Sequence, residues 1–513
     1  MLRQIASVGS LTLLSRITGF VRDIVLASLL GAGLAADAFV VAQRLPNHFR
    51  AIFGEGAFNA AFVPGYARLL EQQGLPAAQA FAAHLLRILI LSLLILTVVA
   101  MVFMPQMVTV LAPGFSANPE KFTLAVNLTR ITFPYLLFIS LVTLFSGVLN
   151  AHERFAAPAF APVLLNLSMI AALLASSFFP DAAHAAAWGV FIAGLLELLL
   201  VVVDAKRAGL MPALTTQSPD ETQQQAMGTF WKALGPGVVG SAGVQLAMFA
   251  DTIIASLLPT GAVASLYYAD RLYQLPVGMI GIAAGTVLLP TMTKFWAAGD
   301  DHAAHHAQNQ AMALTLLFSA PFLIAFLMVP ETIMSGLFMR GAFDNDAARA
   351  AGSVLAAYTT GLPAIVLIRS AIASFHARGD TRTPVIAAFI GLGVNIGLKI
   401  MLADPWGASG LALATAVGAW INFGLLVALA MARDWMSPDA ELGRWLAVIA
   451  VSALLMAMIL HLAGPIIHEA SARFEVGQNE TELAILALSG LFAYLAPLFV
   501  LVRGLHLSFR PKQ

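Results

Sequence analysis

The segment Asp23-Ile-Val-Leu-Ala-Ser-Leu-Leu-Gly-Ala-Gly33 recurs as Asp251-Thr-Ile-Ile-Ala-Ser-Leu-Leu-Pro-Thr-Gly261, with six identities in eleven positions at a spacing of 228 residues. A second echo has nearly the same spacing, since Ala151-His-Glu-Arg154 precedes Pro158 and Ala377-Arg-Gly-Asp380 precedes Pro384. Because the two spacings agree, chance matches between helices rich in alanine and leucine are the weaker explanation. We therefore interpret the chain as an internal duplication.

The composition around these segments is that of an integral membrane protein. Of 513 residues, 59% are hydrophobic and 11% are charged, and the mean hydropathy is +0.85. A soluble chain carries about 25% charged residues. Most apolar runs reach the ~20 residues that cross a ~30 Å hydrocarbon core as a helix. A transmembrane barrel would instead show alternating segments of ~10 residues.

We predict an all-α fold with fourteen transmembrane helices. The first 30 residues are not a cleaved signal, because Arg16, Arg22 and Asp23 interrupt the apolar stretch. Connections on the N-terminal side carry fourteen Lys and Arg against four on the other side, which places both termini in the cytoplasm. The spans are expected near residues 8–30, 36–62, 80–104, 123–150, 157–179, 184–204, 233–258, 263–289, 309–329, 348–375, 384–402, 408–432, 443–463 and 482–502.

The duplication and the spans together predict the domain organisation. Residues 1–210 form an N-lobe with spans 1 to 6, residues 211–435 a C-lobe with spans 7 to 12, and residues 436–513 an added pair of helices. Six spans separate the two copies, so the lobes share one orientation and are related by an axis along the membrane normal. Two such lobes can rock about a central cavity, which is the architecture of alternating access.

Several function classes are disfavoured by what the chain lacks. It has no cysteine, which removes disulfides, thiolate metal sites and cysteine nucleophiles. Its net charge of zero argues against a nucleic-acid partner. The adjacent carboxylates Asp300 and Asp301 lie in a polar loop without a further acidic partner, so a membrane-embedded prenyl-phosphate glycosyltransferase is disfavoured. We expect no catalytic residue, no metal and no cofactor.

Nine cations fall within the predicted spans. Each would cost about 2.5 to 3.5 kcal/mol at mid-membrane, or roughly 20 to 30 kcal/mol together, which exceeds the net stability of a domain. Most of them must therefore face water, a carboxylate or the headgroup zone. The nine are Arg16, Arg22, Arg44, Arg50, Arg87, Arg130, Arg271, Arg369 and Lys399.

On spans 1, 2 and 8 these cations and several carboxylates recur at helical spacings, which place them on polar stripes able to line one hydrated cleft. Guanidinium groups bind phosphate bidentately, so a converging set suits a pyrophosphate better than a cationic drug. The alternative is that such arginines form Arg-Asp pairs that lock helices together, or extend to the membrane interfaces, and it is favoured for Arg87, Arg130 and Arg369. On span 1, Arg16 and Asp23 share a face and Arg22 lies beside it. On span 2, one face carries Asp37, Arg44, His48 and Glu55, while Arg50 lies toward an adjacent face. On span 8, one face carries Tyr267, Arg271 and Gln274, with Asp270 next to Arg271.

Several of these residues lie in motifs that resemble the MurJ (MviN) family. The run Ser15-Arg-Ile-Thr-Gly-Phe-Val-Arg-Asp23, then Leu45-Pro-Asn47 with Arg50 and Glu55-Gly-Ala-Phe58, is similar to the family's opening. Tyr268-Ala-Asp-Arg-Leu272 and Ala377-Arg-Gly-Asp-Thr-Arg-Thr-Pro384 match two further motifs. Together they span residues 15 to 384 in the family's order.

The resemblance implies a fold and a function. The family belongs to the multidrug/oligosaccharidyl-lipid/polysaccharide exporter superfamily, with two six-helix lobes and two C-terminal helices that form a groove for the lipid tail. In peptidoglycan biosynthesis, and thus in cell-wall growth and cell shape, MurJ moves lipid II from the cytoplasmic to the periplasmic leaflet of the bacterial inner membrane. Expected partners are lipid II, the bilayer and other cell-wall synthesis proteins. The alternatives are a polysaccharide-lipid flippase or a multidrug antiporter of the same superfamily.

The resemblance also implies site residues. The family's cavity charges fall on Arg16, Arg22, Asp37, Arg50, Asp270 and Arg271, with Asp23 and Glu55 nearby in the same motifs.

Some relatives have a sodium site built from acidic and amide side chains on spans 7, 11 and 12. Here Asp251 and Asn395 could supply oxygens, but Lys399 lies one turn after Asn395, where its ammonium would repel sodium or replace it. We therefore predict no sodium site. We expect transport to be driven by the membrane potential instead, since exporting two negative charges gains about 4 to 5 kcal/mol per 100 mV.

Overall fold

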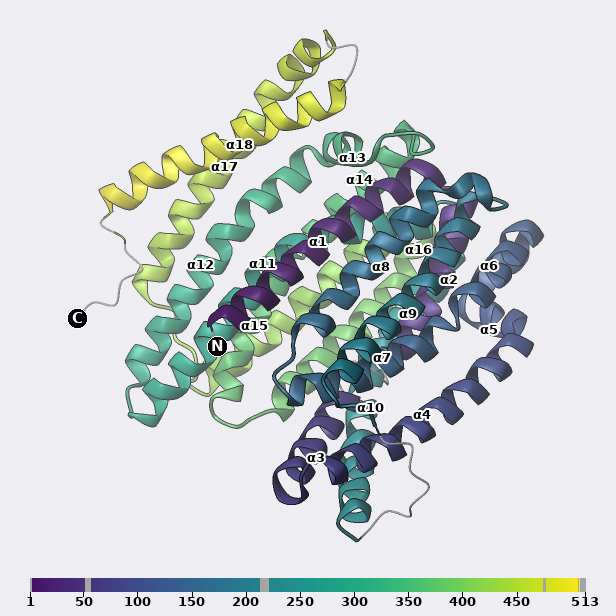
Figure 1. Cartoon of the computed structure of the whole chain (residues 1–513). Coiled ribbons are helices and arrows are strands. Elements are labelled where there is room, and N and C mark those ends of the chain that lie inside the picture. The colour runs from purple at the N-terminus through teal and green to yellow at the C-terminus, as the bar shows by residue number, and fades with distance from the viewer. Residues whose placement is uncertain (1, 51–56, 213–220, 474–476, 506, 508–513) are drawn as a thin grey trace. The chain divides into compact units, whose positions relative to one another are not determined.

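The structure, a computed structural model, describes residues 2–50, 57–212, 221–473, 477–505 and 507. Within these ranges the regular secondary structure is entirely helical, and the described residues of each predicted span fall mainly on helices (Figure 1). The α-helices are α1 (Leu2–Leu30), α2 (Leu34–Arg50), α3 (Ala57–Gln73), α4 (Leu75–Val102), α5 (Met104–Leu111), α6 (Pro119–Thr132), α7 (Tyr135–Ala151), α8 (Ala156–Leu174), α9 (Ala182–Arg207), α10 (Glu221–Ser256), α11 (Ala262–Ala297), α12 (Asp301–Met328), α13 (Pro330–Phe338), α14 (Asn345–Thr359), α15 (Leu362–His376), α16 (Arg382–Ala432), α17 (Ala440–Ser471) and α18 (Gln478–Gly504).

The chain forms two compact units, Met1–Val263 and Ala264–Gln513. The first holds α1 to α10, and the second holds nearly all of α11 and the helices that follow. The boundaries predicted from the sequence, at residues 210 and 435, follow the repeat and stay a prediction.

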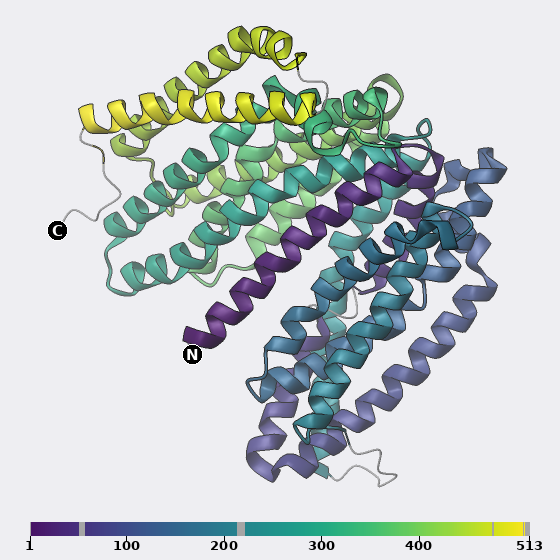
Figure 2. The ribbon, with the colours of Figure 1, turned by 45° about the horizontal axis from the view of Figure 1, so that its top comes forward.

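In the first unit, α1 runs along α8, and α8 packs on α9 (Figure 2). The core of this unit includes aromatic side chains that recur every four residues on α3, at Phe58, Phe62 and Tyr66. This spacing puts them on one helical face. Phe62 stacks on Phe81 of α4 with ring centroids 5.9 Å apart, so the amphipathic pattern of α3 decides which way this helix faces.

The second predicted span, residues 36–62, covers α2 and the start of α3, and residues 51–56 between them lie outside the described part of the chain. α3 then continues to Gln73, eleven residues beyond the predicted end of the span.

Among the described residues, five helices begin with a side-chain cap. Asn118 caps α6, and aspartates cap α9, α12, α14 and α17, each accepting a hydrogen bond from a backbone N–H three residues on. Asp300 is the cap of α12, and its carboxylate accepts from the backbone N–H of Ala303 at 2.9 Å. Its neighbour Asp301 forms an ion pair with Arg378 at 3.6 Å. Both members of this carboxylate pair therefore have structural roles.

α16 contains spans 11 and 12 and reverses direction between them. At Gly407 the backbone has φ 54° and ψ −137°, a conformation that side chains disfavour. The two halves then pack closely, because a Cβ on Gly391 would lie 2.7 Å from the carbonyl oxygen of Gly418. The predicted division of this region at residues 402 to 408 is thus confirmed.

The two copies of the second sequence echo make matching contacts in their own units. In the first unit, Arg154 precedes α8 and pairs with Asp204 near the end of α9. In the second unit, Asp380 precedes α16 and pairs at 2.8 Å with Arg433, just after α16 ends. The repeat conserves the ion pair while exchanging its charges, which supports the duplication.

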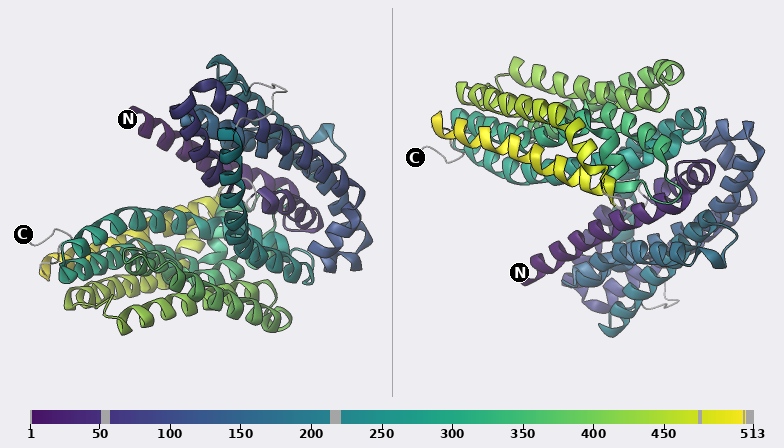
Figure 3. Two further views of the ribbon diagram at one scale, coloured as in Figure 1. Left: turned by 90° about the horizontal axis from the view of Figure 1, so that it is seen from below. Right: turned by 90° about the horizontal axis from the view of Figure 1, so that it is seen from above.

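The described residues include nine helical stretches long and apolar enough to cross a membrane. Large apolar side chains are exposed along α4 and α18, as expected where lipid replaces water, and α17 and α18 run side by side in both views of Figure 3. The remaining predicted spans fall on α1, α2–α3, α10 and α11, which carry most of the charges singled out above. The protein is a multi-pass membrane protein.

The close contact inside α16 gives a stability prediction. Gly391→Ala should lower stability by about 1–3 kcal/mol, because the methyl group meets backbone. Gly393→Ala is the matched control, since no atom lies within 4 Å of its added Cβ, and it should gain about 0.5–1 kcal/mol from helix propensity. Thermal unfolding of the two variants in detergent measures the difference. Equal midpoints would contradict the packing of the two halves.

Candidate functional site

Asp37, in the first turn of α2, is fully buried and ion-paired. Its carboxylate lies 2.5 Å from Nζ of Lys121 and accepts a hydrogen bond from the backbone N–H of Gly261 at 2.8 Å. Lys121 is only 3% exposed and lies over the ring of Phe115, 4.2 Å from its centroid. In this conformation the carboxylate predicted to contact substrate therefore holds parts of the first unit together.

Lys121 lies two residues before the predicted start of span 4 at residue 123, in the first turn of α6, which begins at Pro119. Its pairing with Asp37 could not be predicted from the sequence, because the two residues lie 84 positions apart.

Arg22 is also buried, at 7% exposure, and its guanidinium is fully engaged. Nε and Nη2 donate to Oδ1 of Asp23 at 3.0 and 2.7 Å, and Nη1 donates to Oδ1 of Asn166 on α8 at 2.9 Å. Asn166 in turn donates to the carbonyl of Ser15 at 2.9 Å. For Arg22 and Asp23 this is the helix-locking arrangement, so substrate binding by Arg22 requires an exchange of partners.

The polar stripe of α2 continues toward α10 within the first unit. Arg44 Nη1 donates to Thr252 Oγ1 at 3.0 Å, and His48 Nδ1 lies 2.9 Å from Gln245 Oε1. These two residues therefore share one face of α2, as their spacing predicted. Asp251, one of the predicted ion-coupling residues, is half-buried and adjacent to Thr252.

Arg16 and Arg271 differ from the buried arginines because both are exposed. Arg16 makes no hydrogen bond or ion pair with another described residue, and it shares its face of α1 with exposed Leu13 and Ile17. In the second unit, Arg271 lies over the ring of Tyr267, with Cζ 4.7 Å from the centroid. A guanidinium that is exposed at mid-helix is positioned to meet an anion.

The other predicted site residues have varied surroundings. Arg50, at the end of α2, is half-buried. Asp270 is half-buried and accepts a hydrogen bond from Gln274 Nε2 at 3.2 Å. Glu55 lies outside the described residues.

Sequence reasoning missed Glu197, in the middle of α9. It is 1% exposed, accepts a hydrogen bond from the hydroxyl of Tyr135 and interacts electrostatically with Arg50. The available signal was its isolation, since it is the single charged residue in the predicted span 184–204 before Asp204. Asn166 gave a similar signal in span 5.

Of the other predicted ion-coupling residues, Lys399 is buried on α16 at 1% exposure. One turn earlier, Oδ1 of Asn395 is buried and has no hydrogen-bond partner among the described residues. The described residues also contain no group of three or more histidines and carboxylates that could hold a metal.

The fold and these charges together define a class. Apolar helices account for most of the chain, and the charges within them include buried ion pairs, half-buried groups and arginines exposed at mid-helix. Such intramembrane charges mark a pathway for a polar substrate. The protein is a membrane transporter.

Comparisons with known proteins then place the chain in the MurJ family. The family described as "Lipid II flippase MurJ" matches residues 26–479. A probable lipid II flippase MurJ from Rhizobium meliloti (strain 1021) is 40% identical over 473 residues, covering 90% of this chain and 86% of that relative. The lipid II flippase MurJ of Burkholderia cenocepacia is 35% identical over 461 residues, covering 90% and 89%. The family resemblance predicted from the motifs is confirmed.

Comparison with solved structures agrees with this family assignment. A lipid II flippase MurJ in an inward closed conformation has a TM-score of 0.79 and 25% identity, covering 98% of this chain and 99% of that chain. An inward-facing multidrug transporter of the MATE family has a TM-score of 0.68 at 16% identity, covering 82% and 94%. The second likeness shows a shared fold alone.

The buried pair gives a second prediction. Asp37→Asn or Lys121→Met should each destabilise the protein by about 3–5 kcal/mol, because each leaves the other charge buried without its partner. The double variant should recover part of this loss, and thermal unfolding in detergent measures all three proteins. If the two single losses simply add in the double variant, the pair is not coupled.

Proposed function

We propose that this chain flips lipid II, an undecaprenyl-pyrophosphate-linked disaccharide-peptide, from the cytoplasmic to the periplasmic leaflet of the bacterial inner membrane. The observation that carries the proposal is the match to the MurJ family over residues 26–479. The exposed arginines on α1 and α11 add a chemical reason, since guanidinium groups bind a diphosphate bidentately.

Among the proposed substrate contacts, Arg16 and Arg271 meet the pyrophosphate directly. Arg22 joins by exchanging its hydrogen bonds with Asp23 and Asn166 for phosphate oxygens. Arg50 acts beside the buried side chain of Glu197, which interacts electrostatically with its guanidinium. Asp23 and Asp270 orient the neighbouring arginines, and Asp37 and Glu55 complete the set.

We further propose that the protein works by alternating access with both termini in the cytoplasm. The excess of Lys and Arg on the N-terminal side supports this orientation. With the cell interior negative, outward movement of an anionic lipid is favoured, and the emptied cationic site is drawn back. We propose that Lys399 serves as a fixed cation on α16, with Asp251 and Asn395 not binding sodium.

A transporter without enzymatic activity fits the residues better than the alternative classes do. A prenyl-phosphate glycosyltransferase would need free carboxylates for a metal or a base, but Asp300 caps α12 and Asp301 pairs with Arg378. A multidrug antiporter would need acidic and aromatic groups for a cation, whereas Arg16 and Arg271 are exposed cations. Lipid II also fits the family match better than a polysaccharide lipid does.

The arginine roles give a third prediction. Arg16→Ala and Arg271→Ala should each reduce lipid II flipping at least tenfold, because each removes a charged hydrogen bond to the pyrophosphate. The measurement is leaflet accessibility of labelled lipid II in proteoliposomes. Arg16→Lys should recover only part of the rate, since an ammonium cannot bind bidentately.

Arg87→Ala and Arg130→Ala are matched controls. Both residues are exposed cations within predicted spans but lie outside the proposed site, so flipping should stay near the rate of the unmodified protein. Wild-type rates in the Arg16 and Arg271 variants would exclude the diphosphate-binding role.

The proposed drive gives a fourth prediction. An imposed inside-negative potential should accelerate outward flipping, with up to about 4 to 5 kcal/mol per 100 mV available for two charges. Proteoliposomes with a valinomycin potassium potential provide the test, and replacing sodium with choline should leave the rate unchanged. A rate that follows the sodium gradient and ignores the potential would refute this drive.

A further inference from the structure

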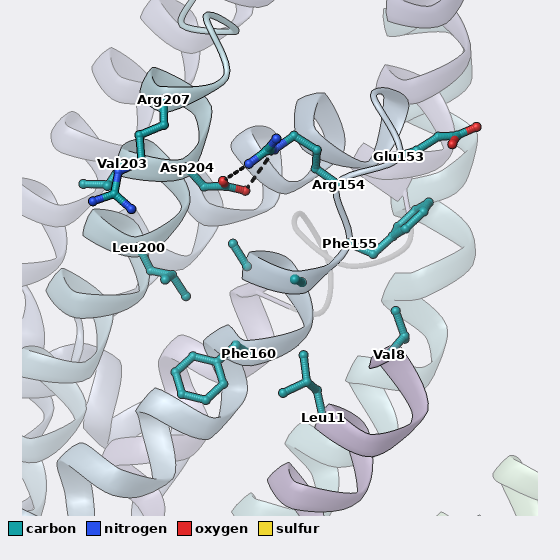
Figure 4. Close-up of a pocket in the computed structure, with 12 residues that line it drawn as sticks. Val8, Leu11, Glu153, Arg154, Phe155, Phe160, Leu200, Val203, Asp204 and Arg207 are labelled. Atoms are coloured by element: carbon teal, nitrogen blue, oxygen red, sulfur yellow. Dashed lines mark hydrogen bonds and ion pairs between the residues drawn. The ribbon is translucent and has the colours of Figure 1, made fainter. Parts of the chain in front are cut away.

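The first unit holds a pocket of about 670 Å³ between the first half of α1, the start of α8 and the last turns of α9 (Figure 4). This volume lies within the ~300–1,000 Å³ typical of sites for a single small ligand. The apolar walls come from all three helices and from the connection before α8. They comprise Val8 and Leu11, Phe155 and Phe160, and Leu200 and Val203.

The charged residues that line this pocket are two cations, Arg154 and Arg207, and two carboxylates, Asp204 and Glu153. Arg154 pairs with Asp204, with Nη2 2.5 Å from Oδ1. Arg207 lines the same pocket and makes no hydrogen bond or ion pair with another described residue. The carboxylate of Glu153 points away from Arg154 and Asp204 (Figure 4). The three facing groups, two cations and one anion, sum to +1.

One face of α9 carries both apolar and charged residues of the pocket lining. Leu200, Val203, Asp204 and Arg207 follow spacings of three and four residues, so they lie on one stripe of the helix. α8 begins at Ala156 and α9 ends at Arg207, so the charged end of the pocket lies where two spans leave the hydrocarbon. The cations therefore sit at headgroup depth and the apolar walls at acyl-chain depth.

We propose that this pocket binds one anionic phospholipid of the bilayer, with its phosphodiester at Arg207 and an acyl chain against Leu11 and Phe160. A phosphodiester carries one negative charge, which neutralises the charge of +1 on the three facing groups Arg154, Asp204 and Arg207. The pyrophosphate of a transported lipid carries more negative charge and would leave these groups and the ligand with a net negative charge. This site is separate from the proposed substrate arginines.

The equivalent connection of the second unit is built differently. There Arg378 lies over the rings of Trp296 and Trp435, with Cζ 3.8 and 5.1 Å from their centroids. Aromatic rings thus cover Arg378 in the equivalent connection of the second unit, while Arg154 and Arg207 border an open pocket in the first.

The test compares two neighbouring cations. The full chain is purified, exposed to dioleoyl-phosphatidylglycerol, and examined by native mass spectrometry for retained lipid. Arg207→Gln should weaken retention of one phosphatidylglycerol about tenfold, the loss expected for one charged hydrogen bond. Lys206→Gln is the matched control, because Lys206 is exposed, adjacent and outside the pocket lining. Its retention should equal that of the unmodified protein.

A second pair of variants tests the acyl-chain site. Val203→Trp fills the pocket and should reduce retention, whereas Leu199→Trp, an exposed position of α9 outside the lining, should not. Equal losses in Arg207→Gln and Lys206→Gln, or equal retention of phosphatidylcholine, would overturn the proposal. Displacement of the lipid by stoichiometric undecaprenyl pyrophosphate would also overturn it and would assign the pocket to the substrate. Lipid flipping is not the readout, so the result is independent of the proposed function.

Discussion

The free-energy cost of a charge in hydrocarbon governs the arrangement of this protein. Each intramembrane cation must find a carboxylate, a polar partner, water or an anionic ligand, because lipid offers none of these. The structure shows two such solutions in the first unit. Asp37 and Lys121 bury their charges against each other, and Arg22 divides its donors between Asp23 and Asn166. Arg16 is exposed instead, which leaves it able to meet an external anion.

Buried, paired charges and exposed charges have different roles: the first stabilise the arrangement of the helices, and the second are accessible to a ligand. A buried pair with full hydrogen bonding stabilises one arrangement of helices, and removing one partner is costly. An exposed guanidinium contributes little to stability and can change its partner quickly. The motif Arg22-Asp23 lies between these cases, since its arginine is engaged here and belongs to the proposed substrate set. A transporter needs such exchangeable contacts if ligand binding is to shift its conformation.

The helices, their order and the duplication could be predicted from the sequence because each depends on local hydrophobic runs and on matching motifs. The pairing of charges could not. Lys121 lies 84 residues from Asp37, and Asn166 lies 144 residues from Arg22, so no helical spacing connects them. Glu197 was overlooked for the same reason, since Tyr135 and Arg50 come from other helices. Helical periodicity states which face a residue occupies, but the helix opposite that face is a matter of tertiary packing.

The carboxylate of Asp37 joins three stretches of the chain that are distant in sequence. It belongs to α2, receives the ammonium of α6 and accepts the backbone N–H of Gly261 just before α11. A shift of any one of these segments by a single residue would break these contacts and leave the buried charge of Asp37 or Lys121 without its partner. The junction therefore fixes the relative positions of these three segments. The conformational change that moves the substrate across the bilayer has to occur in segments outside it.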